Sequence, residues 1–142
     1  LNKIPFLGIC YGMQMAIIEF ARNQMNLKNA TSSEFDKKGL PIIGLINEWT
    51  KDGKMFKGTD KNLGGTMRLG GQASYLIDGT TAHDIYGKNM IFERHRHRYE
   101  VNNNYVVQLQ NGGMKVGGWS ENKSLVEMII QTIVLFCYLG SL

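Results

Sequence analysis

A cysteine between two glycines is the residue with the clearest chemical potential in this sequence. Cys10 lies in Gly8-Ile9-Cys10-Tyr11-Gly12, the Gly-x-nucleophile-x-Gly spacing of a nucleophile elbow with Cys in place of Ser. Such an elbow has a strained backbone and leaves no room for side chains at its flanking positions. It holds the sulfur at the N–H groups of a helix, which favour the thiolate. We expect a nucleophile at Cys10 and an oxyanion donor in the Tyr11 backbone N–H; the alternative is a small buried core cysteine.

The residues on either side of this cysteine predict the elements that hold it. Residues 4–9 form a short apolar run, interrupted by Pro5, that suits a buried parallel strand with the proline at its start. After the cysteine, apolar residues recur at the spacing of one helix face: Met13, Ala16, Ile17, Phe20 and Ala21. We therefore expect a strand over 4–9 and a helix over about 11–25, with Cys10 at the corner between them.

The run at 94–98, Arg-His-Arg-His-Arg, is the second stretch with chemical potential. On a strand the arginines would share one face and the histidines the other. A nucleic-acid surface is disfavoured because only Tyr99 supplies an aromatic ring nearby and the net charge is only +4. His-x-His offers two metal ligands with no third nearby, so no metal site is predicted. An anion-binding strand and a solvated basic edge strand remain as interpretations.

Glu34 is the one acid in a polar loop over 30–35. Its carboxylate is suited to holding an ammonium group of a substrate. The alternative is a helix-capping or solvated acid, because Ser and Glu are common at helix starts.

Composition limits the class of protein. The chain has 142 residues, of which 43% are hydrophobic and 20% charged, enough for one core in an ordinary globular domain. Its two cysteines suggest no disulfide framework, so the reducing cytoplasm is expected. The apolar stretch over 130–142 is too short to span a bilayer, and no membrane partner is expected.

The rest of the chain predicts short elements. Glycines gather at 64–71, but the Walker spacing is absent, so no phosphate-binding loop is predicted. The other expected elements are strands at 41–46, 72–77, 105–110, 114–116 and 125–129, a strand beginning at 89–92, a helix at 80–86, a surface loop or hairpin at 47–62 and a turn at 117–123.

Three stretches carry a family resemblance. Pro-Phe-Leu-Gly-Ile-Cys-Tyr-Gly-Met-Gln at 5–14 resembles the nucleophile motif of class I glutamine amidotransferases. Gly-Gly-Thr-Met-Arg-Leu-Gly at 64–70 and Glu-Arg-His-Arg-His-Arg-Tyr-Glu-Val-Asn at 93–102 resemble the glutaminase domain of the CTP synthase family. The resemblance implies an α/β fold with a mainly parallel central sheet flanked by helices, plus an antiparallel β-rich insertion across about 41–110.

The resemblance also implies an activity. Cys10 would attack the side-chain amide of L-glutamine and release ammonia, with the Tyr11 N–H as oxyanion donor. Gln14, Glu34 and Arg98 would bind the glutamine, and the planar guanidinium of Arg98 suits a two-pronged contact with its carboxylate. The 64–70 stretch would lie near the region where GTP activates the enzyme.

The implied partners lie outside this chain. The ammonia would travel to a synthetase domain that aminates UTP to CTP with ATP and Mg²⁺, in a cytoplasmic homotetramer. No cofactor is expected within the chain itself.

The resemblance covers residues 1–129 and stops there. The family would continue to a His-x-Glu pair that completes the triad, yet no histidine follows His97, and 130–142 is an atypical apolar tail. The family's oxyanion strand, which precedes the nucleophile, is also not covered. We therefore expect a partial glutamine amidotransferase domain over 1–142, without turnover and with a tail that leaves the sheet edge uncovered. The alternatives are another class I amidotransferase, such as a GMP-synthase-type glutaminase, and an inactive fragment that binds glutamine or a partner.

Overall fold

The computed structural model describes residues 6–45, 50–51, 54–55, 68–121, 123–131 and 134–137, with backbone alone at 50–51, 54–55, 131 and 134–137. The elements follow in the order β1 (Gly8–Ile9), α1 (Tyr11–Asn23), β2 (Ala30–Ser32), β3 (Leu40–Leu45), β4 (Thr50–Lys51), β5 (Lys54–Met55), β6 (Arg68–Leu76), α2 (Thr81–Tyr86), β7 (Met90–His97), β8 (Tyr99–Val101), α3 (Asn103–Asn111), β9 (Lys115–Ser120), β10 (Val126–Gln131) and β11 (Val134–Cys137).

Most of these strands form a six-stranded sheet in the order β1-β11-β10-β9-β6-β7, beside a three-stranded sheet in the order β2-β3-β8 and the pair β4-β5. The α/β class is confirmed, but the expectation of a mainly parallel sheet is wrong for the described strands. In the large sheet only β1 and β11 pair in parallel, and the other neighbours are antiparallel. Short connections such as 121–125 between β9 and β10 explain this, because parallel neighbours need a crossover of about a dozen residues or more.

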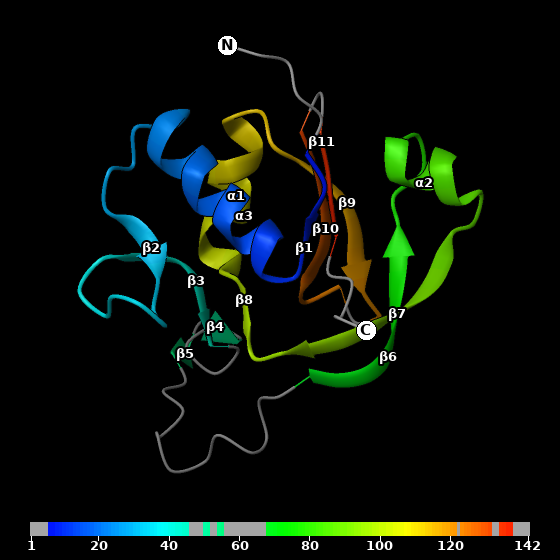
Figure 1. The fold of residues 1–142 in the computed structure, drawn as a ribbon, viewed down its shortest axis with the longest axis horizontal. Helices are drawn as coiled ribbons and strands as arrows, with labels where there is room; N and C mark the ends of the chain where they lie inside the picture. The colour runs from blue at the N-terminus through cyan, green and yellow to red at the C-terminus, as the bar shows by residue number, and fades with distance from the viewer. Residues whose placement is uncertain are drawn as a thin grey trace.

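Helices cover both faces of the large sheet (Figure 1): α1 and α3 lie on one side, and α2 lies on the other. The main core contains Met13 and Ile17 of α1, Leu109 of α3 and Ile129 of β10. A smaller core on the opposite face gathers Leu76, Ala82, Ile91, Met128 and Ile130. The sheet is therefore a buried layer between two apolar packings.

The glycine at 117 is needed for the second packing. A Cβ at Gly117 would come within 2.9 Å of Ile130 Cδ1 and 3.3 Å of Ala82 Cβ. An added side chain would therefore displace the end of the Ile130 side chain and crowd Ala82 of α2, because interiors are close-packed.

The chain leaves the large sheet at Arg98. β7 pairs with β6 along its whole length, whereas β8 begins one residue later and pairs antiparallel with β3 in the small sheet. Arg98 is the bend between the two strands, so a single residue joins the two sheets.

The prediction of a strand over 105–110 is wrong, because these residues lie in α3. The prediction took the Asn111-Gly112-Gly113 turn for the loop between two strands. The buried residues are Val106 and Leu109, which lie three apart on one helix face. The stronger signal was Asn102, whose side chain accepts a hydrogen bond from the Asn104 N–H and caps the helix.

Two further expectations are corrected by the strand bounds. Residues 117–120 belong to β9 rather than to a turn. The tail does not leave the sheet edge uncovered where it is described: β11 lies between β1 and β10 and pairs with both. Its apolar sequence suits such an interior strand. The helices over 11–23 and 81–86 and the strands β3 and β6 confirm the corresponding predictions. Most of 47–62 lies outside the described residues, and its described part is the antiparallel pair β4–β5, as the hairpin alternative expects.

In the part of the chain that the structure describes, no helix is long and apolar enough to cross a membrane. Among the same residues, no group of three or more His, Cys, Asp or Glu side chains is arranged to hold a metal ion.

Candidate active site

The chain turns from β1 into α1 at Cys10, as the sequence predicts. Cys10 has φ 52° and ψ −107°, a left-handed conformation that is strained for a residue other than glycine. Its carbonyl oxygen accepts a hydrogen bond from the Gln14 N–H at 3.2 Å, which closes the first turn of the helix. The predicted strand over 4–9 is described only at Gly8–Ile9, since residues 1–5 lie outside the described residues.

The steric role predicted for Gly12 is not found in the isolated chain. A Cβ at this position would meet nothing within 4 Å. The strain is therefore concentrated at Cys10 itself, where the backbone dihedral is unusual, and open space lies beside Gly12.

The surroundings of Cys10 oppose the thiolate that the elbow is expected to favour. Burial raises the pKa of the Cys10 thiol above its usual value, and the charges of Glu100 and Glu34 raise it further. A hydrogen bond from the Tyr11 backbone lowers this pKa but does not outweigh the other effects. Cys10 is thus held as a neutral thiol near two acidic side chains, and the N–H expected as an oxyanion donor already donates to its sulfur.

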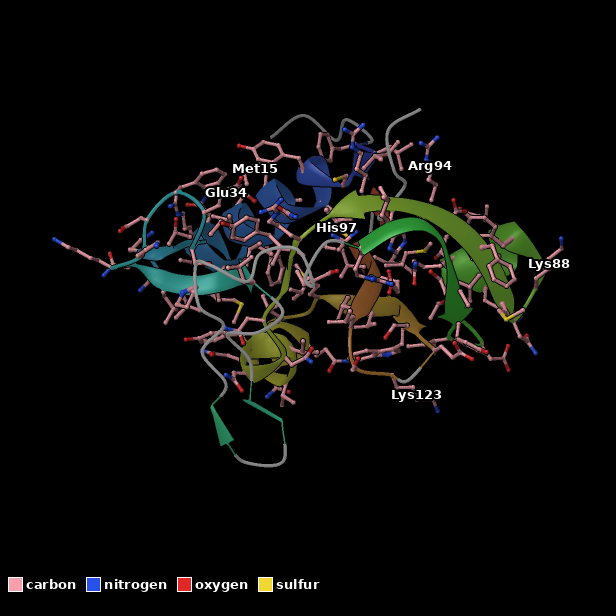
Figure 2. The ribbon with its side chains drawn as sticks, turned by 90° about the horizontal axis from the view of Figure 1, so that it is seen from below. Met15, Glu34, Lys88, Arg94, His97 and Lys123 are labelled. Atoms are coloured by element: carbon pink, nitrogen blue, oxygen red, sulfur yellow. The ribbon has the colours of Figure 1, made fainter. Side chains whose placement is uncertain are left out.

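Glu34 lies beside this cysteine on the turn after β2. Its backbone N–H donates to Ser32 Oγ at 3.2 Å, and Figure 2 shows its side chain alongside α1. The neighbouring Phe35 ring meets the Tyr11 ring edge-on, with centroids 6.0 Å apart. Glu34 starts no helix, so the helix-capping alternative is wrong. Its side chain is exposed, as the solvated-acid alternative expects, and it lies close enough to Cys10 for its charge to raise the pKa of the thiol.

Gln14 joins the elbow helix to the β7–β8 bend. Its side chain is 3% exposed, and Nε2 donates to the Tyr99 carbonyl oxygen at 3.0 Å across 85 positions of sequence. This amide group binds protein backbone, so Gln14 fixes the neighbour of Arg98 against α1.

Arg98 is half-buried at the bend itself. The predicted alternation is confirmed for 94–97, where the arginines are exposed and the histidines buried; Figure 2 shows His97 inside the curve of β6 and β7 and Arg94 on the outer side. Arg98 does not continue the exposed face, because the chain bends before β8. The structure therefore brings Cys10, Gln14, Glu34 and the 98–100 segment together from separate parts of the sequence.

Sequence reasoning missed a buried group of charges behind this site, here called the Arg68 cluster: Arg68, His95, His97, Glu100 and Glu127. Arg68 Nη1 donates to Glu100 Oε1 at 3.2 Å, and Nη2 lies 2.7 Å from Glu127 Oε1. His97 Nδ1 lies 3.3 Å from Glu100 Oε1, and His95 Nε2 lies 3.4 Å from Glu127 Oε2. All but Arg68 are below a tenth exposed, so this is a charged core that unites β6, β7, β8 and β10.

Burial sets the protonation of this cluster. It lowers the pKa of His95 to about 3 and of His97 to about 4, assisted by the charge of Arg68, so both rings are neutral. Burial raises the pKa of Glu100 to about 8 and raises that of Glu127, although Arg68 opposes both shifts. Burial alone would lower the pKa of Arg68, but the two carboxylates raise it. One guanidinium thus neutralises one carboxylate, and the other carboxyl group holds a proton near neutral pH.

One sequence signal could have exposed the cluster. Glu127 is a lone charge within the apolar stretch 125–130, and a buried charge requires a partner. The identity of that partner could not be deduced, because Arg68 lies far away in sequence.

The described histidines make contacts with other groups. His83 lies on α2 and contacts Asn89 Oδ1 at 2.7 Å, on the other face of the sheet from α1 (Figure 1). His95 and His97 point toward the carboxylates of the Arg68 cluster. The turn from β1 into α1 therefore positions Cys10, while the rings of these histidines contact Asn89, Glu127 and Glu100.

The fold and the cysteine elbow define a class of protein. The family model for glutamine amidotransferase class-I matches residues 1–136, and the chain belongs to that family. Within the family it is similar to a CTP synthase from Pelagibacter ubique (strain HTCC1062), with 68% identity over 129 residues that cover 91% of this chain and 24% of the relative.

A solved structure gives the same fold. The Trypanosoma brucei CTPS glutaminase domain with bound acivicin matches with a TM-score of 0.79 and 29% identity, over 98% of this chain and 53% of that one. The chain thus spans about a quarter of the length of the curated relative and about half of the solved chain.

Proposed function

We propose that this chain is the glutamine-hydrolysing part of a CTP synthase. The observation that carries the proposal is the strained elbow at Cys10 in a chain that is 68% identical to a CTP synthase over 129 residues. The acivicin in the trypanosomal glutaminase domain supports a glutamine-like ligand for the corresponding site here.

The chemistry proposed is acyl transfer through a thioester. The Cys10 sulfur attacks the side-chain amide carbon of glutamine, the C–N bond breaks, and the nitrogen leaves as ammonia with the thiol proton. Water then cleaves the thioester and yields glutamate and the free thiol. The Tyr11 N–H turns from the sulfur to the oxyanion that forms in each step.

The substrate contacts proposed follow from charge. Glu34 binds the α-ammonium group and Arg98 the α-carboxylate, while Gln14 contributes its amide at the base of the site. Binding of the ammonium group beside Glu34 offsets the negative charge that raises the pKa of the Cys10 thiol. Substrate binding therefore assists formation of the thiolate.

The reaction also requires a base to take the thiol proton and to activate water. β11 runs parallel to β1, with Cys137 paired to Ile9, so a base placed just after β11 would lie at the edge of the sheet that carries Cys10. Residues 138–142 are Tyr-Leu-Gly-Ser-Leu and lie outside the described residues. We expect the 142-residue chain to bind glutamine without turning it over.

The complete enzyme would use the ammonia elsewhere. In this proposal a synthetase domain aminates UTP to CTP with ATP and Mg²⁺, GTP acts as activator, and the whole is a cytoplasmic homotetramer. The high identity to a CTP synthase disfavours a GMP-synthase-type glutaminase. The raised pKa of the Cys10 thiol favours a second candidate for the chain by itself, an inactive module that only binds glutamine.

Selective labelling tests the proposal. The purified chain is treated with acivicin, and modification at Cys10 and Cys137 is followed by mass spectrometry. We expect saturable labelling of Cys10 that glutamine suppresses, with Cys137 labelled far more slowly, because only Cys10 stands at a helix N-terminus beside the glutamine contacts. Equal labelling of both cysteines, unaffected by glutamine, would contradict a formed glutamine site.

A further inference from the structure

We propose that His97 and Glu100 form a bridge across the bend at Arg98 and act as positioning residues for the glutamine site. The proposal rests on the proposed function, because it concerns how Arg98 and the Tyr99 carbonyl are presented to glutamine. Neither bridging residue is assigned a contact with the substrate itself.

The bend needs an internal support because it joins two separate sheets. β7 ends at His97 in the six-stranded sheet, and β8 begins at Tyr99 in the three-stranded sheet. No backbone ladder spans Arg98, whose side chain therefore depends on the geometry of its two neighbours.

The side chains on either side of the bend supply that support. His97 Nδ1 lies 3.3 Å from Glu100 Oε1 and 3.3 Å from the Tyr99 carbonyl oxygen. Because the carbonyl oxygen can only accept, the proton of the neutral His97 ring sits on Nδ1 and donates into the bend. Both side chains are buried, with Glu100 at 0% exposure, so little room exists for the bend to open.

The bridge is anchored to the rest of the domain through Arg68. Its guanidinium contacts the Glu100 carboxylate and, from the other nitrogen, Glu127 of β10. A planar fork that spans two carboxylates fixes their relative positions better than a point charge would. The bend is thereby fixed to the centre of the large sheet.

The bridge also faces the elbow. The Tyr99 carbonyl that receives the His97 N–H contact also accepts the Gln14 amide at 3.0 Å, and Glu100 is close enough for its charge to raise the pKa of the Cys10 thiol. One short segment, 98–100, therefore contacts both the buried cluster and the first turn of α1. Displacing it would move Arg98 relative to Cys10.

The test compares two buried histidines of one strand in the full chain. His97→Leu removes the donor to the bend, His97→Asn keeps an N–H at the equivalent position, and His95→Leu is the matched control because His95 contacts Glu127 instead. Each variant is treated with acivicin, and the half-saturating concentration and limiting rate of Cys10 labelling are measured. Iodoacetamide, which carries no glutamine-like groups, reports the intrinsic reactivity of the thiol.

We expect His97→Leu to raise the half-saturating acivicin concentration about tenfold or more, because ångström-scale misplacement of a substrate-binding group is costly. The iodoacetamide rate should change less than about twofold, since no charge is removed near the thiol. His97→Asn should restore binding, and His95→Leu should leave it near that of the original chain. Equal effects of His97→Leu and His95→Leu, or no rescue by asparagine, would overturn the proposal and indicate a general packing role.

Amide hydrogen exchange tests the His97–Glu100 bridge independently of the proposed function. His97→Leu should accelerate amide exchange in the 98–101 segment, and His97→Asn should not. If the original chain shows no glutamine-suppressible labelling, the proposed function fails and the exchange rates alone decide about the bridge. Unchanged exchange in 98–101 of a folded His97→Leu chain would overturn it.

Discussion

The Cys10 elbow and the Arg68 cluster differ in the electrostatic surroundings of their ionisable groups. At the elbow Cys10 is partly exposed and strained, and burial together with the charges of Glu100 and Glu34 raises the pKa of its thiol. In the cluster each charged group lies within about hydrogen-bonding distance of an opposite or polar partner. At the elbow the nearby charges oppose ionisation of the thiol, whereas in the cluster one guanidinium lies between two buried carboxyl groups and ties strands of the fold together.

The largest expected effect tests whether the elbow works without a base. The 142-residue chain should release no glutamate above background at saturating glutamine, because a Cys–base pair contributes several orders of magnitude to the rate. Release of glutamate is measured enzymatically, with Cys10→Ala as the control. Turnover that depends on Cys10 would mean that one of the described histidines reaches the sulfur.

The cluster should be the more sensitive region for stability. Arg68→Leu would leave two carboxyl groups buried without a cation and should lower the free energy of unfolding by about 3–5 kcal/mol. Arg94→Leu, on the exposed face of β7, should change it by less than about 0.5 kcal/mol. Urea unfolding measured by circular dichroism compares the two. Similar losses in both variants would show that the cluster is not a supporting core.

The protonated carboxyl group of the cluster predicts a pH dependence. The pKa of Glu100 is raised from 4.5 to about 8, so its contribution to stability is complete below pH 4.5 and is lost as the pH rises through 8. His95 and His97 have lowered pKa values, so their contribution is lost only as the pH falls below 6.5. Between pH 6.5 and 8 the free energy of unfolding should therefore fall, by about 1–2 kcal/mol.

Glu100→Gln provides the control for this pH dependence. The variant should show a flatter profile between pH 6.5 and 8, because the group that titrates there has been removed. An equally steep loss of stability in the variant would assign the titration to another group.

The smallest expected effect concerns Arg98, at the bend between the elbow and the Arg68 cluster. In a complete CTP synthase that carries this segment, Arg98→Lys should reduce glutamine-dependent CTP formation about tenfold, because lysine keeps the charge but loses the two-pronged contact. Ammonia-dependent synthesis should be unchanged, since it bypasses the glutaminase site. A parallel fall in both activities would make Arg98 a structural residue.

The two regions also differ in how far sequence could predict them. The elbow, its helix and the outward arginines of 94–96 depend on contiguous residues and local periods, so they were predictable. The Arg68–Glu100 contact spans 32 positions, and the sequence around either residue does not identify the other as its partner. The alternation of exposed arginines and buried histidines ends at Arg98, because the next strand, β8, pairs with β3 in the small sheet. That pairing is a tertiary effect. The same tertiary choice of neighbours decides whether a sheet is parallel, which short apolar runs do not reveal.

The place of β11 has a consequence for the order in which the domain is assembled. Among the described strands, β1 joins the large sheet only through β11, whose residues follow it by more than a hundred positions. Among these strands, β6, β7, β9 and β10 pair with nearer neighbours, whereas the pairing of β1 with β11 must close a loop of more than a hundred positions. Closing so long a loop is slow, since contacts distant in sequence retard folding. The pairing of β1 with β11 should consequently form late among the described strand pairs, and a ribosome-bound chain that has not yet exposed residues 134–137 should lack it.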